Sequence, residues 1–291
     1  MRPDISKLGL GTAQFCTGDS AFLRGRSPEA EVGEMLASAA RAGLGFLDAG
    51  SASSHAELTL GAQLPRPMPM HMLIKSVRGD RGPDVVEDEA RASLARMGVT
   101  HARAIVVQTA SDLFAPGGAA LWDRLKALRD EGLFDQVGVS VYASDDPLGL
   151  ARRFKPDLIQ APASLLDQRL LLDGSLTAVK ELGIEVHLRS IFLNGLVFLP
   201  PDRVPAQLKG AAGRLSRARR MIAEGRSDPL QAALGFALSR PEADAVIVGA
   251  ATASELAAVI AAAASPPPDL DWDEMAIDDP IALDPRSWEA A

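Results

Sequence analysis

The amino-acid sequence predicts one closed (β/α)8 barrel, the TIM-barrel fold, and three observations support this fold class. The chain has 291 residues, of which 47% are hydrophobic, so it can bury one large core. Short apolar runs alternate with amphipathic helical stretches along the chain, which is typical of a parallel sheet covered by helices. Eight such units in about 250 residues fit a closed barrel better than an open sheet or two domains. We therefore expect a single domain over residues 1–291.

Each expected strand is a short apolar run, and each expected helix carries its own start and stop signals. The strands are expected at residues 8–11, 46–48, 72–77, 104–108, 137–141, 158–161, 185–190 and 245–248. Ser27 and Pro28 are typical of a helix N-cap and first turn, and Pro83 opens a later helix. Glycines that can end helices are Gly43, Gly98, Gly132 and Gly183. Every helix thus returns the chain to the next strand, as right-handed βαβ crossovers require.

Two segments depart from this rhythm. Residues 192–228 are too long for a plain connection, so we expect a lid or an extra helix there. The C-terminal tail, residues 266–291, begins with three prolines and holds eight acidic residues and one arginine. Trp272 and Trp288 are its only expected anchors, and we expect the tail to lie on the barrel surface.

Composition excludes several classes of protein. The single cysteine, Cys16, cannot form an internal disulfide, and the N-terminus has no apolar signal core, so we expect a cytoplasmic protein. No apolar stretch approaches the roughly 20 residues that span a bilayer, so we expect no membrane association. The net charge of −8 argues against nucleic-acid binding. A basic run at Arg214, Arg217, Arg219 and Arg220 is interpreted as a solvated helix face rather than a phosphate site. The sequence does not indicate an oligomeric state.

Polar residues end most of the expected strands, where barrel enzymes place their catalytic groups. They are Asp48, Lys75, Gln108, Ser140, Gln160 and Ser190. A carboxylate and an ammonium at the mouth of adjacent strands are partly buried, and such charges persist there when they pair with each other. We therefore expect Asp48 and Lys75 to form an ion pair suited to proton transfer.

The chain resembles the aldo-keto reductases in several segments that follow in order. LGLGTAQF at residues 8–15 is similar to their first-strand signature. Residues 45–61, GFLDAGSASSHAELTLG, have the spacing of their Asp-Thr-Ala-x-x-Tyr-Gly-x-x-Glu-x-x-Leu-Gly motif. Further matches are IKS at 74–76, SLARMG at 93–98, GVS at 138–140, Gln160, RSIFL at 189–193 and IVGA at 247–250. The resemblance implies a (β/α)8 barrel that binds a nicotinamide cofactor and a small-molecule substrate.

In that family a tyrosine protonates the substrate carbonyl, a lysine–aspartate pair lowers the pKa of the tyrosine, and a histidine orients the carbonyl. The resemblance assigns the pair to Asp48 and Lys75, but the tyrosine position falls on Ser53 and the histidine position on Gln108. A serine hydroxyl is shorter and far less acidic than a phenol, so it cannot take over the proton-donor role. Three other proton donors are possible: His55, Lys75 acting directly or through a water molecule, and a group of the substrate. Gln108 either orients the carbonyl or is a satisfied buried amide.

The resemblance also implies the cofactor-binding residues. They are Gly11, Thr12, Ser140, Gln160, Arg189, Ser190, Phe192 and Gly249. Arg189 replaces the aromatic residue that stacks on nicotinamide, and it either stacks there or reaches an anionic substrate or phosphate. The residues after Gly249 include no lysine or arginine to pair with the 2′-phosphate of NADP, so the choice between NADP and NAD stays open.

No competing motif is present in the sequence. It has no Gly-x-Gly-x-x-Gly fingerprint after a strand and no phosphate loop, and its histidines, at positions 55, 71, 101 and 187, lack the spacing of metal ligands. We expect an NAD(P)-linked oxidoreductase that acts on a carbonyl or hydroxyl of a small, for example sugar-like, molecule. The alternatives are an inactive barrel with a binding or regulatory role, or a lyase or isomerase that uses Lys75 and Asp48. The only tyrosine, Tyr142, does not align with the family's acid, so that acid is absent rather than moved.

Overall fold

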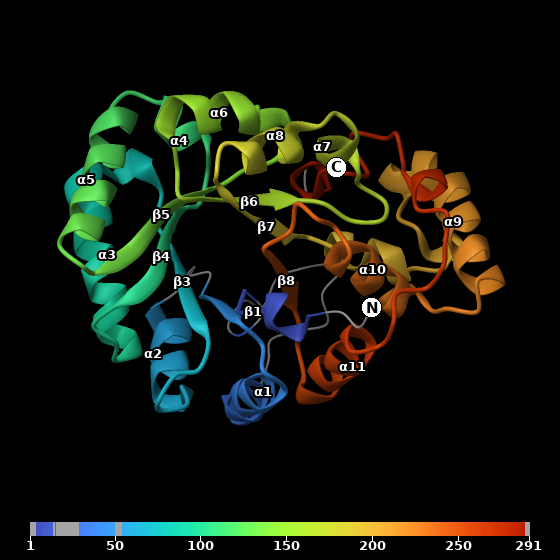
Figure 1. The fold of residues 1–291 in the computed structure, drawn as a ribbon, viewed down its shortest axis with the longest axis horizontal. Coiled ribbons are helices and arrows are strands. Elements are labelled where there is room, and N and C mark those ends of the chain that lie inside the picture. The colour runs from blue at the N-terminus through green and yellow to red at the C-terminus, as the bar shows by residue number, and fades with distance from the viewer. Residues whose placement is uncertain (1–3, 14, 16–28, 50–53, 289–291) are drawn as a thin grey trace.

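Eight parallel strands form a closed barrel in chain order (Figure 1), which confirms the predicted fold class. The computed structural model describes residues 4–13, 15, 29–49 and 54–288. The strands are β1 (Leu8–Gly11), β2 (Phe46–Ala49), β3 (His71–Lys75), β4 (Ala102–Val107), β5 (Phe134–Ser140), β6 (Leu158–Pro162), β7 (Glu185–Arg189) and β8 (Ala245–Gly249). β8 closes the barrel because it pairs with β1 as well as with β7.

The observed strands overlap every predicted one, with differences at the ends. Predicted strand 72–77 extends two residues too far, because β3 ends at Lys75. Predicted strand 185–190 is one residue too long, since Ser190 has a φ of 60°, which no strand residue adopts. Predicted strands 104–108 and 137–141 start late and end one residue too late, because polar residues (Arg103, Asp135 and Gln136) follow the first buried residues of β4 and β5 and interrupt the apolar run.

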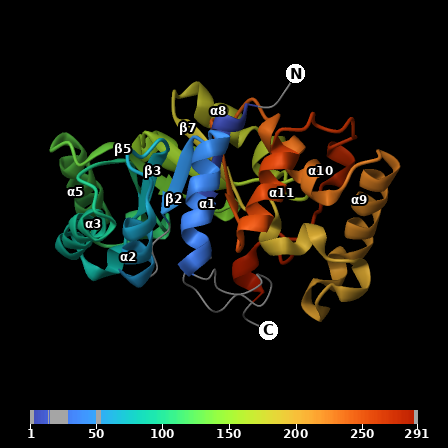
Figure 2. The ribbon, with the colours of Figure 1, turned by 90° about the horizontal axis from the view of Figure 1, so that it is seen from below.

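Helices surround the barrel on all sides (Figure 1). Those of the described residues are α1 (Glu29–Ala42), α2 (Ser54–Gln63), α3 (Pro83–Met97), α4 (Ser111–Phe114), α5 (Gly118–Asp130), α6 (Pro147–Phe154), α7 (Arg169–Leu172), α8 (Ser175–Glu181), α9 (Ala212–Glu224), α10 (Pro229–Leu238) and α11 (Ala253–Ala263). Pro83 starts α3 and Gly98 caps it in the left-handed conformation, as predicted. Figure 2 shows α1 and α11 side by side. The predicted cap at Ser27 and Pro28, and Cys16, lie outside the described residues.

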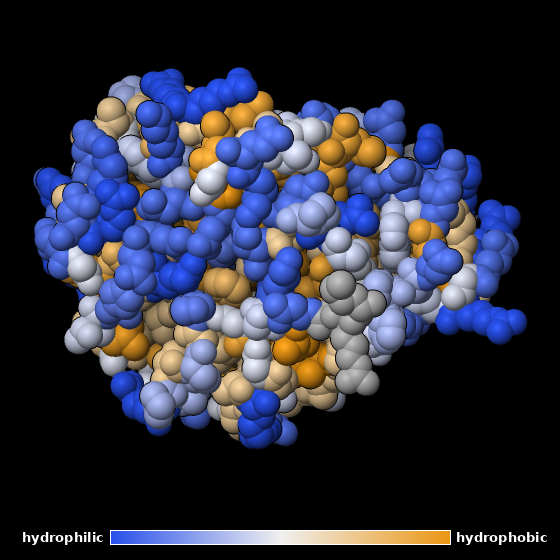
Figure 3. Space-filling view, viewed as in Figure 1, coloured by the Kyte–Doolittle hydropathy of each residue, from blue (hydrophilic) through white to orange (hydrophobic). Residues whose placement is uncertain are grey.

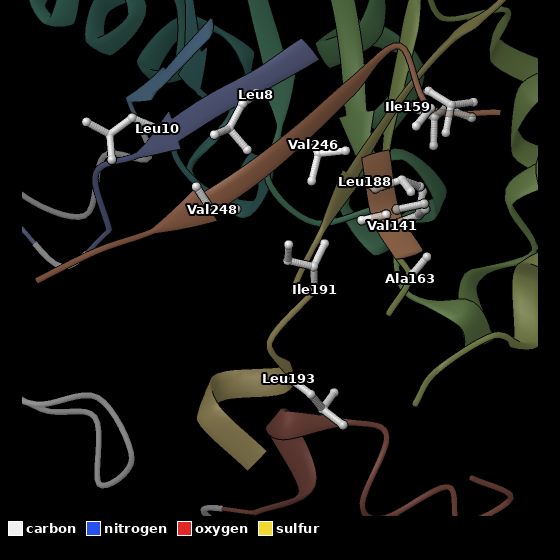
Figure 4. Packing of buried hydrophobic residues seen from close by; sticks show 14 of the residues in the cluster. Leu8, Leu10, Val141, Ile159, Ala163, Leu188, Ile191, Leu193, Val246 and Val248 are labelled. Carbon is white, nitrogen blue, oxygen red and sulfur yellow. The ribbon is translucent and has the colours of Figure 1, made fainter. Parts of the chain in front are cut away.

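The core has two parts, inside the barrel and between the strands and the helices. Phe46, Leu73, Val106, Leu158 and Ile247 fill the interior together with two alanines. The larger part alternates with them along the strands, and Figure 4 shows some of its side chains on β1, β8 and the segment after β7. A close approach occurs between α2 and α3, where a Cβ on Gly61 would lie 2.5 Å from the backbone oxygen of Arg96.

The segment after β7 contains three 3₁₀ turns, Leu193–Phe198, Pro201–Arg203 and Ala206–Ala211, followed by α9, which lies at the edge of the molecule (Figure 1). Of its basic run, Arg217 pairs with Glu274 of the C-terminal segment, and Arg219 donates to the carbonyl oxygen of Leu199 at 3.0 Å. At least two of the four arginines therefore bind other parts of this chain.

The C-terminal tail is built into the core more deeply than predicted. Besides Trp288, which is 4% exposed, the tail buries Met275, Ile277 and Leu283. The expectation that the two tryptophans are its only anchors is therefore wrong. The buried apolar residues are spaced irregularly among acidic residues. Because this spacing matches neither the helical nor the strand period, the sequence pattern did not predict their burial. The face of the molecule in Figure 3 is mostly hydrophilic, with apolar side chains in small groups.

Candidate functional site

The carboxyl ends of β2, β3 and β6 bring three polar side chains into one hydrogen-bonded cluster. Lys75 Nζ donates to Asp48 Oδ1 at 2.6 Å, to Asp48 Oδ2 at 2.8 Å and to Gln160 Oε1 at 2.5 Å. Gln160 Nε2 in turn donates to Asp48 Oδ2 at 3.3 Å. The side chains of Asp48 and Lys75 are each 11% exposed, so this is an ion pair largely withdrawn from water.

Hydrogen bonds to the backbone of Asp48 fix the position of this residue in the barrel. Thr12, which is 3% exposed, follows β1 and donates both its backbone N–H and its hydroxyl to the carbonyl oxygen of Asp48. Gly11 and Asp48 are aligned in neighbouring strands, so Asp48 cannot shift along the barrel without breaking sheet pairing. Burial lowers the pKa of Lys75 below its usual value of 10.5, and the nearby carboxylate of Asp48 opposes this shift. The arrangement suits a group that exchanges a proton.

The ammonium of Lys75 has three N–H donors, and all three are engaged within the protein. Gln160 is likewise occupied on both sides of its amide, because it accepts from Lys75 and donates to Asp48. One N–H and one lone pair of the amide have no partner among these hydrogen bonds. Release of this amide frees one N–H of Lys75 at the barrel mouth.

A second cationic feature lies at the end of β7. Arg189 is partly buried, and it donates from Nη2 to the carbonyl oxygen of Val141 at 2.7 Å and from Nη1 to Ser190 Oγ at 3.1 Å. Its guanidinium carbon lies 4.4 Å from the centre of the Tyr142 ring, and that of Arg286 lies 3.5 Å from the same ring. The only tyrosine of the chain is thus a platform for two guanidinium groups.

The backbone that follows Arg189 adopts a rare conformation. Ser190, Leu193 and Asn194 have φ values of 60°, 47° and 47°, in the left-handed region that non-glycine residues seldom enter. Each such residue costs on the order of 1 kcal/mol, and clusters of them mark ligand-binding segments. Phe192, within this segment, packs against Phe198 at a ring distance of 5.2 Å.

Two carboxylates occupy the N-terminus of α11, directly after Gly249. Glu255 Oε2 accepts from the backbone N–H of Ala251 at 2.9 Å, and Glu31 Oε2 of α1 accepts from that of Ala253 at 2.7 Å. These N–H groups would otherwise attract an anionic ligand to this helix end. The loop therefore presents negative charge and hydrogen-bond acceptors rather than a phosphate site.

Comparison with known proteins agrees with this arrangement. The model of the aldo/keto reductase family matches residues 7–277. The chain belongs to the aldo/keto reductase family. No curated protein matches the sequence.

Solved aldo-keto reductases share its fold at low sequence identity. The holo form of one from Bacillus halodurans is 17% identical, with a TM-score of 0.70, and the match covers 90% of this chain and 87% of the other. Two structures from Pseudomonas aeruginosa assigned to the same family are 18% and 19% identical. Their TM-scores are 0.66 and 0.63, and the matches cover 89% and 91% of this chain and 90% and 93% of the others. At this identity the likeness extends to the fold alone.

The remaining predicted site residues of this aldo/keto reductase lie outside the cluster or outside the described residues. His55 is 55% exposed at the start of α2 and pairs with Glu29 at 3.1 Å. Gln108 is exposed just after β4, so the interpretation as a buried amide is wrong. Ser140 is 6% exposed and aligned with Gln160 in the next strand. Ser53 lies outside the described residues.

Sequence reasoning about this aldo/keto reductase missed Arg286, Glu31 and Glu255 as residues of the barrel mouth. Arg286 had a signal, because it is the single basic residue of an acidic tail. Glu31 had none, since its contact joins α1 to α11 across 222 positions of the chain. Among the described residues there is no group of histidine, cysteine or acidic side chains that suits a metal ion, and no helix long and apolar enough to cross a membrane.

Proposed function

We propose that this aldo/keto reductase is an NAD(P)-linked oxidoreductase that interconverts a carbonyl and a hydroxyl group on a small molecule. The observation that carries the proposal is the buried cluster of Lys75, Asp48 and Gln160 at the carboxyl ends of three strands. Barrel enzymes place their reacting groups at this end. A bound, reduced nicotinamide dinucleotide supplies a hydride to the carbonyl carbon. The carbonyl oxygen then requires one proton, which this chain's residues must provide.

Thr12, Ser140, Gln160 and Ser190 are the side chains that would hold such a cofactor. Ser140 and Gln160 offer a hydroxyl and an amide side by side, which suits a neutral carboxamide that needs both a donor and an acceptor. Gln160 also accepts from Lys75, so the same amide contacts the proton-transfer cluster and would contact the cofactor.

Lys75 is the proton donor that the geometry favours. His55 is a weaker candidate, because its side chain is exposed and pairs with Glu29. An ammonium whose pKa is lowered by burial gives up its proton more readily than an exposed lysine. Reduction is expected to slow as the pH rises through this lowered pKa, because the donor is then already deprotonated. The alkaline limb of the rate profile should lie below pH 10.5 and should be absent from Lys75→Gln.

The cofactor is expected to be NAD rather than NADP. Glu31 and Glu255 place two carboxylates at the N-terminus of α11, where the family resemblance positions the adenosine end of the cofactor. Carboxylates accept hydrogen bonds from a ribose hydroxyl and repel a 2′-phosphate. Titration by nucleotide fluorescence should show tighter binding of NADH than of NADPH, and Glu31→Gln should narrow the difference by about ten-fold. Tighter binding of NADPH by the natural protein would refute this preference.

Activity is tested on the natural protein and on matched variants. Turnover of dicarbonyls and aldoses with NADH should fall by roughly 10²–10⁴-fold in Lys75→Met. Ser53→Tyr, which restores the phenol of the family pattern, should raise the reduction of simple aldehydes. Failure of the natural protein to bind either nucleotide at millimolar concentration would refute the oxidoreductase and leave a binding role for the barrel.

A further inference from the structure

Among the described residues, the Arg189 cation at the barrel mouth has no carboxylate partner. Its neighbours at this end are neutralised: Lys75 by Asp48, Arg169 by Asp167 and Arg286 by Asp284. Within the described residues, by contrast, no carboxylate lies within 4 Å of the Arg189 guanidinium, and its partners are neutral: the oxygens of Val141 and Ser190 and the hydroxyl of Tyr142. A guanidinium withdrawn from water is unfavourable unless an anion pairs with it.

The donor geometry of Arg189 leaves room for one anion. Each Nη nitrogen carries two N–H bonds and donates one of them to Val141 or Ser190. Among the described residues, the remaining N–H on each nitrogen has at most a neutral partner, the hydroxyl of Tyr142, which an anion can displace. The two remaining donors match the two oxygens of a carboxylate, which a guanidinium binds in a bidentate manner. Nε is buried without an acceptor, so the protein itself does not satisfy this group.

The surroundings hold the guanidinium rigidly. It lies against the Tyr142 ring. Val141 and Leu188, the chain neighbours of Tyr142 and Arg189, belong to the buried apolar core (Figure 4). The strained backbone at Ser190, directly after Arg189, fixes the end of β7. A side chain that is stacked, anchored at both Nη nitrogens and not neutralised is preorganised for a ligand.

Arg189 is also electrostatically coupled to the proton-transfer cluster. Its charge contributes to lowering the pKa of Lys75, and Asp48 acts on the pKa of Arg189 in the opposite direction to burial, which lowers it. The two cations therefore act on each other electrostatically, from the ends of β3 and β7 at the same mouth of the barrel.

We propose that Arg189 binds the carboxylate of the substrate, and that this aldo/keto reductase acts on small oxo or hydroxy acids. The reaction of these acids rests on the proposed function, whereas the binding of a carboxylate by Arg189 does not. The carboxylate lies on the two Nη donors that Val141 and Ser190 do not use, and the carbon–oxygen bond that reacts lies at Lys75. A neutral aldose lacks the group that Arg189 binds and is expected to be turned over more slowly than an oxo acid of similar size.

The test is binding, measured without turnover. Acid and amide pairs of two to six carbons, such as pyruvate and pyruvamide, are titrated into the full chain by calorimetry or ligand-observed NMR. For at least one pair the acid should bind about ten-fold more tightly, which equals about 1.4 kcal/mol. Arg189→Met should abolish this preference, and Arg189→Lys, which keeps the charge but loses the fork, should retain part of it.

Arg153→Met is the matched control. Arg153 stacks on two aromatic rings, with its guanidinium 5.2 Å from the Phe114 ring and 5.1 Å from the Phe154 ring, but it belongs to the outer helix α6. Removal of this charge should leave the acid preference unchanged.

Three outcomes overturn the proposal. They are the absence of an acid preference in every pair, an equal preference in Arg189→Met, and a loss of NADH affinity in Arg189→Met with carboxylate binding intact, which would assign Arg189 to the cofactor. Circular dichroism of both Arg189 variants confirms that they fold. Carboxylate binding through Arg189 without reduction of any oxo acid supports the site and refutes only the proposed reaction.

Discussion

Asp48→Asn isolates the energetic role of the buried ion pair. The substitution keeps the size of the side chain but replaces the carboxylate that lies 2.6 Å from Lys75 Nζ. At that distance, with an effective dielectric constant of about 20, the lost attraction is about 6 kcal/mol. The loss of stability is smaller than this value because Lys75 can lose its proton. Deprotonation at pH 7 of a group whose usual pKa is 10.5 costs about 5 kcal/mol, so the variant should lose about 3–5 kcal/mol of stability.

The pH dependence of this loss distinguishes an ion-pair effect from general damage. In the variant, burial without the carboxylate of Asp48 should lower the pKa of Lys75 further and leave the folded state with a neutral amine, whereas the unfolded state keeps the usual pKa of 10.5. The stability of the variant should therefore rise with pH, by up to about 1.4 kcal/mol per unit, and its deficit relative to the natural protein should shrink between pH 7 and pH 9.

The assay is urea unfolding followed by tryptophan fluorescence at pH 7, 8 and 9. The double variant Asp48→Asn with Lys75→Met removes both charges and should regain at least half of the lost stability. A deficit below about 1 kcal/mol at pH 7 would refute the reasoning, as would a deficit that stays constant up to pH 9.

Two further substitutions test the scaffold. Glu185 has a pKa lowered to about 2, first by its contact with His187, so its stabilisation is complete above pH 4.5 and is lost as the pH falls through 2. Glu185→Gln should lower the free energy of unfolding by about 1–2 kcal/mol at pH 6, after discount for solvent screening, and should have almost no effect near pH 2. Acid-unfolding curves of the variant and the natural protein that stay apart down to pH 2 would contradict this. Gly61→Ala should cost more than about 2 kcal/mol in urea unfolding, because its Cβ would meet the backbone oxygen of Arg96, whereas Gly213→Ala in α9, with nothing within 4 Å, should be neutral or stabilising. Equal effects of the two alanines would contradict the packing argument.

Most of the barrel was predictable because its signals are local. Apolar runs of four to seven residues and helix stop signals such as Gly98 depend on neighbours in the chain, so all eight strands were found. The errors lie where tertiary context decides. β7 ends before Ser190 because that residue adopts a positive φ, which its side chain does not signal. The tail is buried through Met275, Ile277 and Leu283, whose spacing follows neither a strand nor a helix.

The candidate site was predictable only where it depends on local sequence signals. The pairing of Asp48 with Lys75 follows from their places at the ends of adjacent strands, and the structure forms it. The position of Gln160 in that pair joins residues 112 apart in the chain, and no local pattern encodes it. The aromatic platform at Tyr142 likewise depends on Arg189 and on Arg286 from the far end of the chain.

The closure of the barrel by β8 has a consequence for synthesis of the protein. Residues 8–189 provide seven strands, and until Ala245–Gly249 follows, β1 and β7 are open edges of an incomplete sheet. Open edges with unpaired backbone groups are templates for association with other chains. Pairing between β1 and β8 joins the most distant strands of the chain, so it forms late and slowly. The nascent chain is therefore most prone to aggregation just before its last strand is made, and it is at that stage that a chaperone would protect it most.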